Sequence, residues 1–86
     1  MRVEEIINEV KELRTANHRS ALQVVRLLDS NRKLFTGKID LPDFNFIIKN
    51  FESLADTAPK DYNSPAFKRD FETAFESLLF HLNKII

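Results

Sequence analysis

Apolar residues recur every three or four positions along nearly the whole chain. An α-helix has about 3.6 residues per turn, so this spacing puts the apolar side chains of each segment on one side of a helix. The one glycine, Gly37, lies where the pattern is interrupted most clearly. We therefore predict an all-α fold.

The pattern divides into four segments, and we predict helices over about 3–15, 19–35, 41–56 and 65–84. Apolar residues of the second segment cover most of the helix perimeter, which indicates a central, well-buried element. A chain of 86 residues forms one domain, and short connections favour antiparallel neighbours. We expect one small antiparallel helical bundle over residues 1–86, with a core that holds Ile6, Val10, Leu13, Val25, Leu28, Ile47, Phe51, Phe71, Phe75, Leu78 and Leu82.

The junction at residues 15–20 contains neither glycine nor proline. Ser20 followed three residues later by Gln23 fits a capping box, in which each of the two side chains accepts a hydrogen bond from a backbone N–H at the start of a helix. This favours a break and a new helix start near residue 20. The alternative is one continuous helix over residues 3–35, which would make a bundle of three helices.

Two later interruptions have clear turn chemistry. Gly37 suits the end of a helix, because glycine adopts positive φ without steric cost. Asp40 is then a good N-cap for the next helix, with Pro42 in its first turn. Ile39 and Phe44 flank this start in the positions of a hydrophobic staple. The last helix has the same kind of start, since Ser64 precedes Pro65.

Two phenylalanines do not fit the apolar stripes of their helices. Successive residues of a helix are about 100° apart, so Phe46 points away from the side that carries Phe44 and Phe51. Phe80 stands apart from the stripe of the last helix in the same way. We expect both to be exposed and to bind a partner, since aromatic residues are enriched in the energetic centres of interfaces. The alternative is that they are ordinary exposed residues or are covered by the 57–64 loop, which contains Tyr62.

The net charge is zero, but it is the sum of segments that carry different net charges. Residues 1–12 hold two bases and four acids (−2), residues 13–39 hold six bases and one acid (+5), and residues 40–86 hold five bases and eight acids (−3). Three bases recur every seven residues and so line one face of the predicted second helix: Arg19, Arg26 and Lys33. That face fits an acidic protein surface or nucleic acid phosphates. Nucleic acid is the less favoured partner, because dedicated nucleic-acid binders are strongly basic overall.

The sequence offers little chemistry for catalysis or for metal binding. No cysteine is present, and neither His18 nor His81 has Asp, Glu or His three or four residues away. The segment around Gly37 resembles the second half of a calcium EF-hand loop. However, Arg32, Leu34 and Thr36 stand where that loop needs oxygen ligands. We expect no catalytic residues, no metal and no cofactor.

The sequence also bears on location. The first ten residues are acidic and lack the apolar segment of a signal peptide. No apolar run reaches the roughly 18 residues that a membrane span requires. The last helix is amphipathic, but its polar face mixes acids with bases, unlike helices that bind anionic lipid. We expect a cytoplasmic protein with no membrane span.

Binding to another protein is the function that remains. Adaptors, inhibitors, bacteriocin-immunity proteins and small regulatory subunits use helical bundles of this size, a comparison that rests on the fold alone. We expect a non-enzymatic binding or regulatory module whose partner surface includes Phe46, Phe80, Arg19, Arg26 and Lys33. The alternative is a nucleic-acid-associated accessory protein that uses only the basic face. Association of the chain with itself is a third option.

Overall fold

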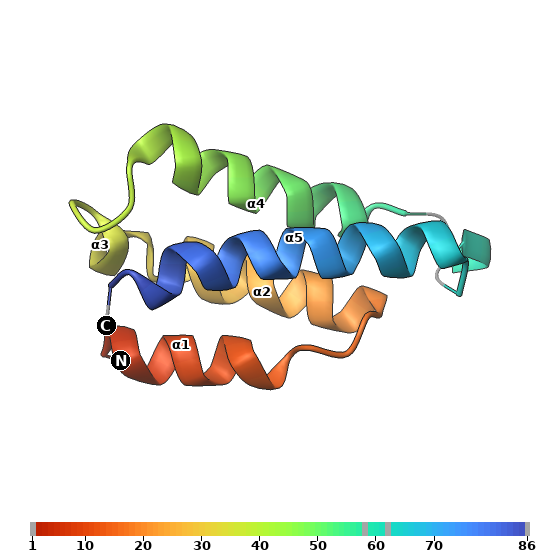
Figure 1. Cartoon of the computed structure of the whole chain (residues 1–86), viewed down its shortest axis with the longest axis horizontal. Coiled ribbons are helices and arrows are strands. Elements are labelled where there is room, and N and C mark those ends of the chain that lie inside the picture. The colour runs from red at the N-terminus through yellow and green to blue at the C-terminus, as the bar shows by residue number, and fades with distance from the viewer. Residues whose placement is uncertain (1, 58, 62, 86) are drawn as a thin grey trace.

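Helices account for the regular structure of the described residues, which are 2–57, 59–61 and 63–85 of a computed structural model. Figure 1 shows their order along the chain. The elements are α1 (Val3–Glu12), α2 (His18–Ser30), α3 (Arg32–Phe35), α4 (Leu41–Ala55), the 3-10 helix η1 (Pro59–Asp61) and α5 (Pro65–Asn83). The predicted all-α fold is confirmed.

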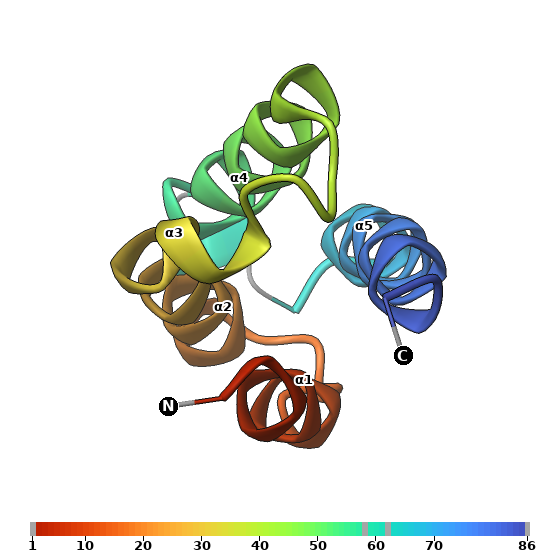
Figure 2. The ribbon, with the colours of Figure 1, turned by 90° about the vertical axis from the view of Figure 1, so that its left-hand side faces the viewer.

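The four longer helices form an antiparallel bundle. Each runs opposite to the one before it, along the 38 Å axis of the molecule (Figure 1). The view along the helices places α2 and α5 on either side of α4, with α1 closing the bundle opposite α4 (Figure 2). Helix α4 packs against both α2 and α5, and α1 packs against α2. No helix in the described part of the chain combines the length and apolar character of a membrane span.

The break between the first two helices is confirmed, and the alternative of one long helix is wrong. Helix α1 ends at Glu12, three residues earlier than predicted, and α2 begins at His18. The cap differs from the prediction, because the Oδ1 atom of Asn17 accepts a hydrogen bond from the backbone N–H of Ser20 at 2.7 Å. Ser20 is buried inside the first turn of α2. An Asn side chain at the N-cap satisfies one of the amides that a helix start leaves unpaired.

The prediction of one helix over residues 19–35 is wrong at Asn31. Helix α2 ends at Ser30, and α3 starts at Arg32. The side-chain amide of Asn31 donates to the carbonyl of Leu27 at 2.8 Å. It thereby occupies the acceptor that the backbone amide of Asn31 would use if the helix continued. Asn side chains compete with helical hydrogen bonds in this way, and the break follows from that competition.

The turn between α3 and α4 is built largely as predicted. Gly37 has φ +81°, in the left-handed region, and the amide of Ile39 donates to the carbonyl of Phe35 at 3.2 Å. Ile39 and Phe44 are both buried, as expected for a hydrophobic staple. Asp40 occupies the N-cap position, but its side chain makes no capping hydrogen bond. One of the two usual donors is missing there, because Pro42 has no N–H.

The start of α5 follows the prediction. The Oγ atom of Ser64 accepts from the amide of Phe67 at 3.1 Å, and Pro65 is the first helical residue. Tyr62, considered as a cover for the exposed phenylalanines, lies outside the described residues.

The core is larger than predicted. Nine of the eleven predicted core residues are buried, whereas Leu13 and Val25 are only half-buried. Leu13 lies beyond the end of α1, and α2 turns Val24 rather than Val25 inward. Further buried residues are Ile7, Ala21, Val24, Phe35, Ile39, Phe44, Ile48, Leu54, Phe67 and Ala74.

Aromatic rings join α4 to α5 in the centre of the core. Phe51 meets Phe71 and Phe75 edge to face, with centroids 5.9 and 6.5 Å apart. Phe71 and Phe75 stack on each other at 5.8 Å. Such pairs contribute about 0.5–1.5 kcal/mol beyond the area they bury. They hold the two helices side by side and so fix the outer seam between them.

Candidate functional site

Phe46 and Phe80, the two phenylalanines outside the apolar stripes of their helices, are exposed, as predicted. Phe46 on α4 is 63% exposed and Phe80 on α5 is 60% exposed. Leu41, at the start of α4, is exposed to the same degree, at 62%. Single exposed apolar residues are common, so exposure alone does not mark a site. Phe46 and Leu41 each border a hollow, and the hollow beside Phe46 is the larger, at about 410 Å³ against about 250 Å³.

A groove runs along the outer seam between α4 and α5. Its central hollow has a volume of about 410 Å³ and is lined by Phe46, Asn50, Ser53, Leu54, Asp70, Thr73, Ala74 and Ser77. A second hollow of about 390 Å³ shares three of these residues and extends toward the start of α5, with Thr57, Asp61, Ser64, Ala66 and Phe67. We call the surface formed by these residues the α4/α5 groove. It exists because most of the side chains along the seam are small.

Opposite helix directions fix which residues lie level with each other across the groove. The Nε2 atom of His81 is 3.8 Å from Oδ2 of Asp43, so the last turns of α5 lie beside the first turn of α4. Counting from this pair at equal rise per residue puts Phe46 level with Leu78, next to Ser77, and Leu54 level with Asp70. Phe46, Ser77, Leu54 and Asp70 all line the same hollow.

Phe80 is exposed on α5 and is not among the residues that line the α4/α5 groove. It lies seven residues after Thr73, and residues at this spacing share one side of a helix. The ammonium group of Lys84 lies over its ring, 4.2 Å from the centroid. The neighbouring His81 is half-buried, and its Nδ1 donates to the carbonyl of Ser77 at 2.9 Å, since a carbonyl oxygen only accepts. Phe80 therefore lies on the side of α5 that carries Thr73, outside the residues that line the hollow beside Phe46.

The three predicted basic residues do not share that surface. Arg19 and Arg26 are exposed on α2, and Lys33 is exposed on α3, beyond the break at Asn31. Their spacing of seven residues assumed one unbroken helix, which the structure lacks. Helix α2 lies on the opposite side of the bundle from the α4/α5 groove (Figure 2).

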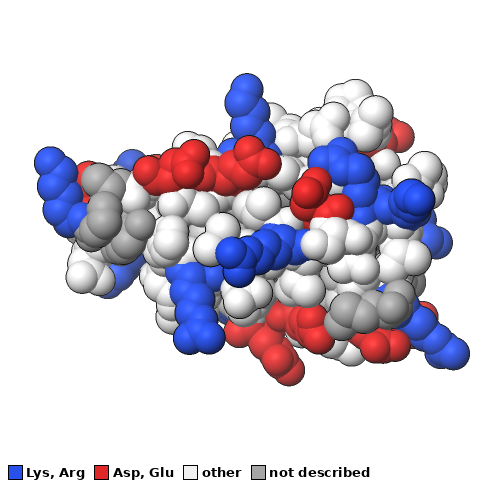
Figure 3. Space-filling model, turned by 180° about the vertical axis from the view of Figure 1, so that it is seen from behind, with Lys and Arg blue, Asp and Glu red and all other residues white. Residues whose placement is uncertain are grey.

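The face opposite to the one seen in Figure 1 carries both positively and negatively charged side chains. Figure 3 shows Lys and Arg side chains over this face, interspersed with Asp and Glu. No patch of a single sign extends across the part of this face that the structure describes. The predicted partner residues thus fall into two separate groups, Phe46 with Phe80 and the three bases.

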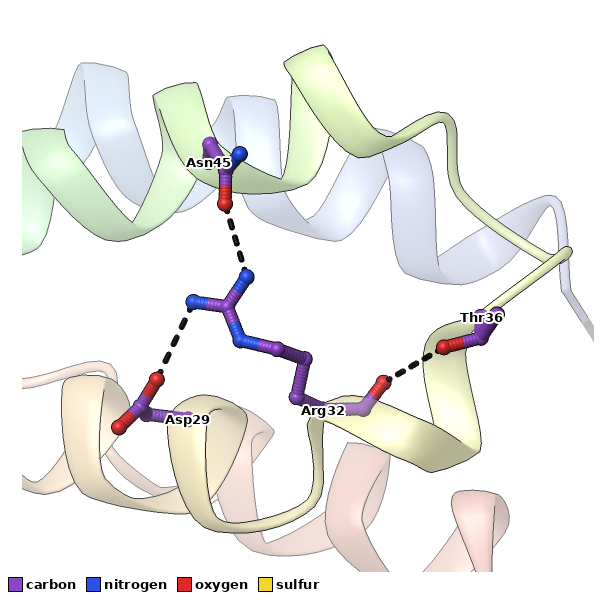
Figure 4. Close-up of polar contacts among 4 residues, drawn as sticks. All are labelled: Asp29, Arg32, Thr36 and Asn45. Atoms are coloured by element: carbon purple, nitrogen blue, oxygen red, sulfur yellow. Dashed lines mark hydrogen bonds and ion pairs between the residues drawn. The ribbon is translucent and has the colours of Figure 1, made fainter.

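Arg32, a further base of this region, has a structural role. Its Nη1 donates to Oδ1 of Asn45 at 2.8 Å, and its Nη2 pairs with Oδ1 of Asp29 at 3.1 Å (Figure 4). The guanidinium group also lies over the ring of Phe44, 5.1 Å from the centroid. Thr36 donates to the carbonyl of Arg32 at 3.4 Å. These contacts connect the end of α2 to α4, so Arg32 positions helices rather than presenting a free charge.

The residues of the α4/α5 groove were mostly missed by sequence reasoning. The small polar residues Asn50 and Ser53 on α4, and Thr73 and Ser77 on α5, recur at helical spacing. Each pair is in a helix that also has a phenylalanine outside its apolar stripe, and this combination could have indicated a binding surface. It becomes informative only when the two helices are known to be neighbours.

Among residues 2–57, 59–61 and 63–85, no three His, Asp or Glu side chains come close enough together to hold a metal ion. Compared with known protein families, with curated proteins and with solved structures, the chain matches none of them. The surface chemistry therefore carries the functional argument.

Proposed function

We propose that this protein is a non-enzymatic binding module that recognises another protein through the α4/α5 groove. Adaptors, inhibitors and bacteriocin-immunity proteins have roles of this type. The observation that carries the proposal is that exposed Phe46 borders a hollow floored by Leu54 and Ala74, between the two helices that carry the exposed Phe46 and Phe80. Aromatic anchors beside a cavity are typical of the energetic centres of protein interfaces.

Polar groups around the anchors supply the rim that such an interface needs. Asn50, Ser53, Thr73 and Ser77 offer hydrogen-bond donors and acceptors beside the apolar floor. Asp70 and Asp61 add negative charge toward the start of α5. An apolar centre with a polar rim is the usual anatomy of a protein-binding surface.

The test is an affinity capture with the tagged chain in its native cell, followed by mass spectrometry. We expect a partner that the Phe46→Ser/Phe80→Ser double variant no longer retains. Leu41→Ser is the matched control, because Leu41 is equally exposed but borders a different hollow, next to Arg32. Equal capture by the double variant and the wild type would exclude the α4/α5 groove as the binding surface.

Salt separates this proposal from the nucleic-acid alternative. Binding through apolar burial is screened little by ions, so capture should survive moderate salt. Binding through Arg19, Arg26 and Lys33 to phosphates would weaken steeply between low and physiological salt. Association that is salt-sensitive and indifferent to the phenylalanine substitutions would favour the basic residues.

A further inference from the structure

We propose that the hollow between α3 and the start of α4 binds a small apolar carboxylate. The apolar part of the ligand enters the hollow, and its carboxylate meets the guanidinium group of Arg32. The hollow has a volume of about 250 Å³ and is lined by residues of α3, of the turn at Gly37 and of the first turn of α4. It shares no lining residue with the α4/α5 groove, so this site is independent of the proposed function.

The walls of the hollow are mostly apolar. Phe35, Ile39 and Phe44 line it and are buried in the core, so they close its inner side. Leu41 also lines it but is 62% exposed, so it stands at the mouth. Pockets that bind small molecules have this character, with apolar walls and few polar groups. An apolar group that enters the hollow leaves water and gains contacts with these side chains.

The volume of the hollow limits the size of its ligand. An apolar cavity of about 150 Å³ lined by Leu, Ile and Phe side chains can take up benzene. The hollow here is larger, so it has space for a benzene ring with a short substituent, or about ten non-hydrogen atoms. The rings of Phe35 and Phe44, with centroids 5.6 Å apart, supply aromatic walls for such a ring.

The charge of the hollow favours an anion. Arg32 is the one charged side chain among the described residues that line it. The guanidinium group lies over the ring of Phe44, 5.1 Å from the centroid, so the positive charge adjoins an apolar wall. The charges of residues 29–40 also leave an excess of one positive charge, from three bases and two acids: Arg32, Lys33, Lys38, Asp29 and Asp40.

The structural contacts of Arg32 are compatible with this role. Its Nη1 donates to Oδ1 of Asn45 at 2.8 Å, and its Nη2 donates to Oδ1 of Asp29 at 3.1 Å (Figure 4). A guanidinium group has more N–H groups than these two contacts use, and the Arg32 side chain is 41% exposed. The contacts hold the group in one orientation, so little conformational freedom is lost when a carboxylate binds.

Two ligands of nearly the same shape test the site. Phenylacetate carries a carboxylate where phenylacetamide carries a neutral amide. Each is titrated into the isotope-labelled full chain, and the backbone amide signals are followed by NMR. We expect phenylacetate to shift the signals of Thr36, Gly37 and Ile39 until they saturate, with a Kd of about 1 mM or tighter. Phenylacetamide should bind about 10-fold more weakly, because it forms no charge-assisted hydrogen bond with Arg32.

The titration of the wild type can overturn the inference without any variant. It does so if phenylacetate causes no saturable shift of these amide signals, or if the two ligands bind with equal affinity. Hexanoate, an aliphatic carboxylate, shows which apolar group the hollow prefers. We expect it to bind more weakly than phenylacetate, because it has no ring to contact Phe35 and Phe44.

Arg32→Gln tests the source of the preference for the acid. We expect this variant to bind both ligands equally, with the affinity that the wild type has for phenylacetamide. Circular dichroism checks that the variant folds, because Arg32 also connects α2 to α4. A folded variant that still prefers phenylacetate overturns the inference. If the variant does not fold, the comparison of the two ligands on the wild type still decides.

Leu41 and Phe46 provide matched variants. Both lie on α4 and are equally exposed, at 62% and 63%, but Leu41 lines this hollow and Phe46 lines the α4/α5 groove. Leu41→Ser should weaken phenylacetate binding about 5-fold, because apolar contact at the mouth is lost. Phe46→Ser should leave it unchanged. The reverse result would mean that the ligand binds in the groove, which overturns the inference.

Discussion

Phe44 and Phe46 lie two residues apart on α4 and should respond very differently to replacement by alanine. Phe44 is 3% exposed and Phe46 is 63% exposed. Each substitution removes the same atoms from the same helix, so the pair compares two environments with the chemistry held constant. We expect Phe44→Ala to destabilise the protein strongly and Phe46→Ala to change its stability little.

The magnitudes follow from burial. A buried Phe→Ala change costs about 3–5 kcal/mol, and Phe44 also loses the Arg32 guanidinium over its ring, worth about 0.5–1 kcal/mol. Only roughly a third of Phe46 is shielded from solvent, and alanine returns about 0.5 kcal/mol through its higher helix propensity. We therefore expect a loss of about 1 kcal/mol or less for Phe46→Ala. A domain of this size has a total stability of about 4–13 kcal/mol, so Phe44→Ala should come close to unfolding it.

Urea denaturation followed by circular dichroism at 222 nm measures both values. The protein is kept dilute, so that self-association does not add to the apparent stability. Equal losses for the two variants would refute the reasoning, because they would mean that α4 does not present Phe46 to solvent. A larger loss for Phe46→Ala would show that another part of the chain covers it.

Two further predictions concern the ends of helices. Gly37→Ala should cost about 1–2 kcal/mol of unfolding free energy, since its φ of +81° is unfavourable for an L-residue. An added Cβ would meet no atom within 4 Å, so the loss is one of backbone conformation, and Gly37→Asn should lose less in the same urea titration. Asn17→Ala should remove the cap of α2 and cost about 1 kcal/mol, which lowers Tm by about 4–8 °C. Asn17→Asp keeps an acceptor for the Ser20 amide, so a thermal melt in which both variants fall equally would contradict the capping role.

Side-chain hydrogen bonds decided where the predicted helices were wrong. Asn31 ends α2 by donating to the carbonyl of Leu27, and Asn17 replaces the expected Ser20 as the cap. Both positions carry Asn, whose side chain can bond locally whether or not a helix continues. The sequence marks these residues as candidates for a break, but whether they cause one depends on the energy of the packed alternatives.

For the candidate site, too, the sequence predicted some features correctly and others wrongly. Helical periodicity alone identified Phe46 and Phe80 as exposed, because a regular helix fixes the direction of every side chain. It also suggested a basic stripe through Lys33, which the break at Asn31 removes.

The sequence by itself determined the helical class, the outward direction of both phenylalanines, and the turn at Gly37. These depend on local geometry, which neighbouring residues specify. Only the tertiary structure decided that α4 and α5 lie side by side and that small residues leave a groove between them. It also brought Phe46 and Ser77 to the same hollow. Such features depend on the register between segments far apart in the chain, and that register is set by packing of the whole core.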